Sequence, residues 1–160
     1  MIIPLCKASL VAVIGGFFGV VAFGNITDYG TNWAFVQHVL AMDTIFPNST
    51  LRWRAITDPR IAALGYGLII AWQVLTAAVL LYAAARMATS ARDSARFDAT
   101  KPLAVLGLTL GLLLYGLGFM VIGGEWFAMW QSQTWNGVPS AARFIMMIGL
   151  TLLVVLAPER

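Results

Sequence analysis

The sequence predicts an all-α membrane protein: a bundle of four transmembrane helices with a long, partly helical outer loop between the first and the second. Of the 160 residues, 60% are hydrophobic and only 11% are charged, whereas soluble domains average about 25% charged residues. Four segments also reach the roughly 20 apolar residues that a helix needs to cross a bilayer. The few, scattered basic residues exclude a soluble nucleic-acid binder, and no nucleic-acid partner is expected.

The ends of the expected spans are marked by capping residues and prolines. Within a single domain, the expected spans cover residues 4–24, 61–85, 102–124 and 139–157. Asp58 before Pro59 predicts the start of the second span, because a carboxylate followed by a proline favours a helix N-terminus. Thr100 is expected to cap the third span, and Pro139 is expected to open the fourth.

The first span has a second interpretation as a cleaved signal peptide. Ala22, Phe23 and Gly24 loosely match the small-x-small pattern of a cleavage site. A transmembrane helix is favoured because the apolar run is long and Lys7 is its only basic residue.

The distribution of lysine and arginine predicts the orientation. With four spans, both termini and the 86–101 loop share one side, and basic residues are denser there than on the other side. The positive-inside rule therefore places both termini in the cytoplasm and the 25–60 loop outside.

Small residues four positions apart predict close helix contacts. Gly15 and Gly19 form such a pair in the first span, and Gly107 and Gly111 form one in the third. In lipid, close backbone approach replaces hydrophobic burial as the force that associates helices. Either these notches pack the four helices on one another, or one of them is a docking face for a second subunit.

Gln73 lies near the centre of the second span, where a polar side chain needs a hydrogen-bond partner. Thr76 lies one helical turn further on, and Thr109 or Tyr115 of the third span are also candidates. Gln73 then either holds two helices together or belongs to a binding site.

The long outer loop is expected to be ordered. Asn32 is expected to cap a helix over residues 33–44 that is apolar around most of its circumference. Such a helix lies in the membrane interface or packs on the outer ends of the spans. A shorter helix is expected after Pro47, capped by Asn48 or Ser49.

Function is expected on the outer side. Trp126 and Trp130, four residues apart on a helical continuation of the third span, are either interfacial anchors or part of an aromatic pocket. The acidic and basic groups of this side are expected to pair with each other, which clamps the loop, or to pair with lipid phosphates. His38 and Asp43 are the first choice for a site, because they are the polar residues expected to face the most apolar surroundings. The candidate ligand or partner residues are His38, Asp43, Arg52, Arg54, Glu125, Trp126, Trp130 and Gln73. No catalytic residue, metal site or cofactor is assigned, because one histidine and one cysteine supply few ligands.

Three motifs of the outer loop, "NITDYGTN", "VQHVLAMDTIFP" and "WRAI", carry a family resemblance. The chain resembles, over nearly its whole length, a bacterial family of predicted small integral membrane proteins. The resemblance implies a polytopic protein of the inner membrane, and it brings no activity, cofactor or catalytic residue.

Three hypotheses for function follow. The first is an accessory or scaffold subunit that docks with a larger membrane protein complex. The second is a binder or carrier of a lipid or other hydrophobic ligand at the outer membrane interface. The third, a membrane enzyme, requires His38 or Glu125 in a cleft with a shifted protonation equilibrium.

Overall fold

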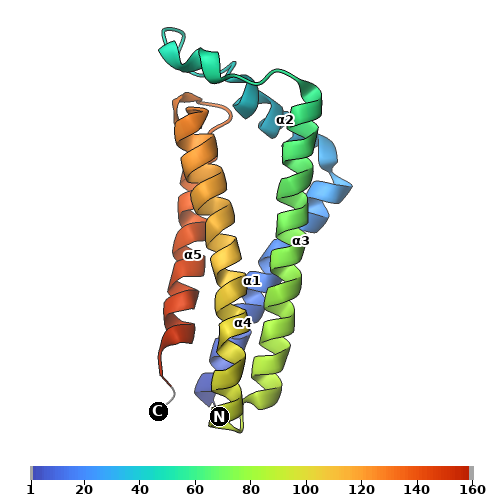
Figure 1. Ribbon diagram of the computed structural model, residues 1–160, viewed down its shortest axis with the longest axis vertical. Coiled ribbons are helices and arrows are strands. Elements are labelled where there is room, and N and C mark those ends of the chain that lie inside the picture. The colour runs from blue at the N-terminus through green and yellow to red at the C-terminus, as the bar shows by residue number, and fades with distance from the viewer. Residues whose placement is uncertain (1, 159–160) are drawn as a thin grey trace.

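The computed structural model describes residues 2–158, and four of its helices are long and apolar enough to cross a membrane (Figure 1). They are α1 (Ile2–Thr27), α3 (Pro59–Ser90), α4 (Ser94–Leu113) continued by η2 (Leu114–Trp126), and α5 (Val138–Leu156). The predicted four-helix membrane bundle is therefore confirmed. The start of α1 and the end of α5 lie at the same end of the bundle, which we call the inner end (Figure 1).

The opposite, outer end is covered by the segments that join the spans. These segments, residues 28–58 and 127–137, form an outer layer across the bundle (Figure 1). Its helices are α2 (Tyr29–Ala41), η1 (Thr50–Arg54) and η3 (Met129–Gln131). The long loop is thus partly helical, as predicted.

The predicted start of α2 is wrong. The helix begins earlier, at Tyr29, and it ends at Ala41, because Met42 adopts a left-handed conformation with φ of 52°. Asn32 lies inside the helix and does not cap it; its side chain contacts α1 instead. The short helix η1 is confirmed, with Ser49 as its cap: the Ser49 hydroxyl accepts from the Leu51 N–H at 3.4 Å.

The start of α3 follows its sequence signal, and the start of α4 does not. The Asp58 carboxylate accepts from the Arg60 N–H at 2.8 Å, directly before the first turn of α3. In contrast, α4 is capped by Asp93, and Thr100 lies inside the helix, where its hydroxyl donates to the Phe97 carbonyl at 2.6 Å. Hydropathy marks where a helix enters lipid, whereas α4 continues beyond that point through a polar stretch.

Two glycines make room for one buried side chain at the centre of the bundle. Leu80 of α3 is fully buried between α1 and α4. A Cβ at Gly107 would lie 2.6 Å from Leu80 Cδ2, and a Cβ at Gly15 would lie 3.0 Å from Leu80 Cβ. Both distances are shorter than a carbon–carbon contact at optimal separation, so three helices approach this closely only because neither position has a side chain.

A second close contact lies nearer the outer end. A Cβ at Gly111 would lie 2.9 Å from Cε2 of Phe18, which is fully buried on α1. Gly19 is less restricted, since the nearest atom, Ala77 Cβ, would be 3.9 Å away. The tightest of the predicted notches are thus filled by side chains of this chain.

Two lysines close the inner end of the bundle. The ammonium groups of Lys7 and Lys101 donate to the Ala157 carbonyl at 2.5 and 3.3 Å. This carbonyl follows the last turn of α5, where the helix dipole favours a cation. Lys7, although only 3% exposed, therefore links α1 to α5.

The outer half of the third span is a π-helix, which the sequence did not predict. Along η2, N–H groups bond to carbonyls five residues back, as does the Phe127 N–H to the Ile122 carbonyl at 3.0 Å. Where α4 passes into η2, the Trp72 indole donates to the Leu110 carbonyl at 3.0 Å. Beyond this point α3 and η2 diverge toward the outer end (Figure 1). π-Helical segments are rare in proteins, and those that occur are often found at functional sites. The space beside η2 is therefore a candidate for a functional site.

Candidate functional site

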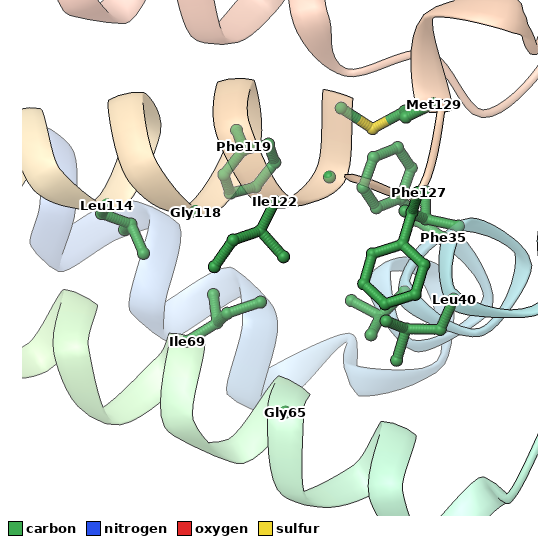
Figure 2. Close-up of a pocket in the computed structure, with 13 residues that line it drawn as sticks. Phe35, Leu40, Gly65, Ile69, Leu114, Gly118, Phe119, Ile122, Phe127 and Met129 are labelled. Atoms are coloured by element: carbon green, nitrogen blue, oxygen red, sulfur yellow. The ribbon is translucent and has the colours of Figure 1, made fainter. Parts of the chain in front are cut away.

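An apolar cavity of about 250 Å³ lies between α2, α3 and η2, beneath the outer layer (Figure 2). We call it the apolar cavity. Its walls are formed by Phe35, Val36, Val39, Leu40, Gly65, Ile69, Leu114, Gly118, Phe119, Ile122, Gly123, Phe127 and Met129.

The walls combine branched side chains with glycines. Ile69 of α3 and Ile122 of η2 point toward one another across the space (Figure 2). Gly118 and Gly123 are five residues apart, so the π-helical repeat places both on the same wall, and Gly65 faces them from α3. The cavity is not closed on all sides, and Ile122, which lines it, is 45% exposed.

A second cavity, of about 350 Å³, is lined by residues of α1, α2, α3, η2 and α5, and we call it the polar chamber. It shares Phe35, Val36, Ile69 and Phe119 with the apolar cavity, so the two spaces adjoin. Its polar lining residues are Asn25, Asn32, Tyr66, Gln73, Tyr115, Asn136 and Ser140.

A relay of amide side chains connects three helices at this chamber. The Asn32 amide donates to Asn25 Oδ1 at 2.7 Å, and the Asn25 amide donates to Gln73 Oε1 at 2.7 Å. The Tyr66 hydroxyl donates to the Asn25 carbonyl at 3.2 Å. Gln73, which is 3% exposed, is thereby fixed from one side.

The predicted partners of Gln73 were wrong. Thr76 donates to the Trp72 carbonyl at 2.8 Å, within its own helix. The partner is Asn25, which the sequence placed in the outer loop because the apolar run ends at Gly24. Helix α1 continues to Thr27, and this extension carries Asn25 to the level of Gln73.

Tyr115 lines the chamber with a hydroxyl group that makes no hydrogen bond to the described residues. Its side chain is 3% exposed, and its ring packs at 4.9 Å from Phe144 and 5.4 Å from Phe119. Its hydroxyl has no hydrogen-bond partner among residues 2–158. In that part of the chain, Arg54 Nε is the one fully enclosed side-chain nitrogen or oxygen without a partner, so the Tyr115 hydroxyl opens onto the chamber that Tyr115 lines.

Neither cavity contains a charge on its walls. None of the described residues that line the two spaces is acidic, basic or histidine. Within residues 2–158 there is also no group of three or more His, Cys, Asp or Glu side chains that could hold a metal ion. The arrangement suits an uncharged molecule with one apolar and one polar part.

His38 and Asp43 lie together, but outside these cavities. His38 Nδ1 is 2.7 Å from Asp43 Oδ2, and the imidazole stacks on Trp135 with ring centres 4.7 Å apart. Both border a hollow of about 240 Å³ on the outer surface, which Asp58 also lines. Their side chains are 39% and 46% exposed, so the expectation that they face apolar surroundings was wrong.

We expect His38→Ala and Asp43→Ala to reduce stability only slightly. Exposed ion pairs contribute about 0.2–1 kcal/mol, and the two changes should be less than additive because they remove one shared contact. Thermal melting of the single and double variants in detergent measures this coupling. A loss of several kcal/mol from either change would show that the pair holds the outer layer on the spans.

Two of the outer arginines, Arg52 and Arg54, bind backbone carbonyls, which corrects their expected pairing with carboxylates. Arg52 donates to the Met42 and Ile45 carbonyls, both at 3.3 Å. Arg54 donates to the Trp126 carbonyl at 3.2 Å, and its guanidinium lies 4.7 Å from the centre of the Trp126 ring. These carbonyls lie at chain turns and helix ends, which leave acceptors unpaired. Glu125 is exposed.

Trp126 and Trp130 do not lie on one continuous helix, as the sequence had suggested. The chain turns between them at Ala128, whose φ is 52°. Trp126 meets Trp53 edge to face at 6.0 Å, and Trp130 meets Phe46 in the same manner at 5.8 Å. Trp126 therefore joins η1 to the end of the third span, and Trp130 joins the loop before η1 to η3.

Comparison with known proteins yields one family. The family model described as predicted small integral membrane protein (DUF2165) matches residues 3–158. No curated protein and no solved structure matches the chain.

Proposed function

The chain belongs to this family of predicted small integral membrane proteins, and we propose that it binds a membrane-soluble molecule that enters the apolar cavity from the bilayer. The observation that supports the proposal is a partly open apolar cavity between α3 and η2 that adjoins the polar chamber. Ligand sites in membrane proteins and elsewhere are typically concave and mostly apolar, with a few placed polar groups.

Local structure supports this use of the space. Two helices packed along their full length leave no cavity between them. Here α4 packs closely on α3 at Gly107, whereas η2 diverges from α3 (Figure 1). The glycines at 65, 118 and 123 leave the walls without side chains where bulkier residues would fill the gap. Binding of one hydrophobic molecule is therefore our preferred function.

Docking with a larger membrane protein is the competing prediction. The notches that suggested it, at Gly15, Gly107 and Gly111, are occupied by Leu80 and Phe18 of this chain. Packing within the chain thus accounts for these glycines.

Purification in mild detergent distinguishes the two functions. We expect mass spectrometry of an organic extract to find one small hydrophobic molecule in near-stoichiometric amount, enriched over an unrelated four-span protein purified in the same way. Recovery of a stable protein partner, with only the general lipid mixture in the extract, would favour docking and contradict ligand binding.

We further propose that the chain lies in the bacterial inner membrane with both termini in the cytoplasm. Arg86, Arg92 and Arg96 near the inner end support this orientation through the positive-inside rule. A reporter active only in the cytoplasm, fused after Arg160, should be active, and the same reporter inserted at Asn48 should be silent. The reverse pattern would invert the topology.

A further inference from the structure

We propose that the polar chamber binds a flat, uncharged ring that bears carbonyl oxygens, while an apolar tail on that ring leaves through the apolar cavity. Isoprenoid quinones belong to this chemical class. The inference rests on the proposed function, because it names the head group of the molecule that the apolar cavity admits.

The hydrogen bonds among Asn32, Asn25 and Gln73 determine which polar groups of the chamber remain available to a ligand. Asn32 donates to Asn25, and Asn25 donates to Gln73 Oε1, so the Gln73 acceptor is used. The Gln73 amide N–H groups then have no acceptor among the described residues, and neither does the Tyr115 hydroxyl. The Gln73 amide N–H groups and the Tyr115 hydroxyl are therefore available as donors on the buried part of the wall, which favours a ligand with an oxygen acceptor.

The shape and chemistry of the remaining wall favour a flat ring. The aromatic side chains that line the chamber are Phe35, Tyr66, Tyr115, Phe119 and Phe144. Aromatic rings pair favourably with other flat rings in offset or edge-to-face arrangements. At about 350 Å³, the chamber falls within the size range of small-molecule sites.

The absence of charge on the described walls excludes charged head groups. A phosphate or carboxylate in the chamber would lose its hydration and find neither Lys nor Arg among the residues described there. Burying an unpaired charge is far more costly than burying a hydrogen-bonded carbonyl. Phospholipids and fatty acids therefore fit this site poorly.

Phe35 and Phe119 lie where the two spaces adjoin. Both residues line both cavities, and their rings stack at 6.3 Å with an angle of 21°. A head group held at Tyr115 would thus have its tail beside these rings, leading toward Ile69 and Ile122.

Titration of the purified chain with decylubiquinone tests the inference. Tyr115→Phe removes a hydroxyl that makes no bond within residues 2–158, so we expect an unchanged melting temperature and a Kd about three- to tenfold higher. Tyr82→Phe is the matched control, because the Tyr82 hydroxyl accepts from Arg86 at 3.0 Å on the exposed surface. It should leave the Kd unchanged.

Decanol and decanoic acid serve as probes with a similar tail and a different head. We expect the quinone to bind more tightly than either, and Gly65→Leu to abolish binding of all three. Equal affinities for the quinone and decanol, or a Kd unaffected by Tyr115→Phe, would overturn the carbonyl-ring inference while tail binding stands. If none of the probes binds saturably, the proposed function itself fails.

Discussion

Replacing Gly107 by leucine is expected to prevent stable assembly of the bundle or to lower its melting temperature strongly. Even the Cβ of alanine would lie 2.6 Å from Leu80 Cδ2 and 3.1 Å from Val79 Cγ1. Leu80 is fully buried, and on its other side it packs against Gly15 of α1. Overpacking a core costs about 1–3 kcal/mol and occasionally more, and here the insertion separates three helices at once.

Thermal melting in detergent should rank the variants at this position. We expect Gly107→Ala to be less stable than wild type and Gly107→Leu to be less stable still. Gly149 of α5 is the matched control, since a Cβ there would meet no atom of the described residues within 4 Å. Leu80→Ala should partly rescue Gly107→Ala, because it removes the atoms that clash. Equal stability of Gly107→Leu and Gly149→Leu would show that the close contact between Gly107 and Leu80 does not contribute to the stability of the bundle.

Replacing Gly65 by leucine, unlike replacing Gly107, is expected to leave the protein folded and to remove the bound molecule. A Cβ at Gly65 would meet no described atom within 4 Å, and Gly65 lines the apolar cavity. The leucine side chain would therefore occupy the space of the ligand without displacing the protein. Exchanging glycine for leucine inside a helix also favours folding by up to about 1 kcal/mol, so the melting temperature should be unchanged or higher.

Gly67→Leu is a close control for this change. Gly67 lies two residues further along α3, is exposed, and would also meet no described atom within 4 Å. It receives the same gain in helix propensity but does not line the apolar cavity. We expect at least tenfold less ligand in extracts of Gly65→Leu than in those of Gly67→Leu, which requires the Kd to rise at least tenfold, a loss of at least about 1.4 kcal/mol of binding free energy. Equal recovery from both variants would show that nothing binds beside α3 at this level.

The sequence predicted those features that depend on local chemistry. Apolar length identified the four spans, and the Asp58–Pro59 pair marked the start of α3, because a capping carboxylate acts on its own helix. Gly107 and Gly111 stood out because close helix approach in lipid needs small residues at this spacing.

The features that depend on neighbouring helices could not be predicted in this way. The contact between Asn25 and Gln73 requires α1 to continue past its apolar run, which tertiary packing decides. The π-helical repeat of η2 has no signature in hydropathy, although its cluster of glycines is visible in the sequence. Arg52 and Arg54 bind carbonyls that become available only after the outer layer has folded.

The polar chamber could not be predicted from the sequence either, because it too depends on how neighbouring helices pack. Tyr115 appeared only as a possible partner of Gln73, whereas the structure places it on the chamber wall with an unused hydroxyl. Its aromatic surroundings come from α1, η2 and α5. No single segment of sequence carries that arrangement.

A density map of the protein in native lipid nanodiscs, enlarged for electron cryo-microscopy by a bound antibody fragment, tests the central claim most directly. We predict one elongated density that enters between α3 and η2, passes Phe35 and Phe119, and ends within hydrogen-bond distance of the Tyr115 hydroxyl. A map in which both cavities hold only isolated water-sized features, or in which α3 and η2 close against each other, would contradict it.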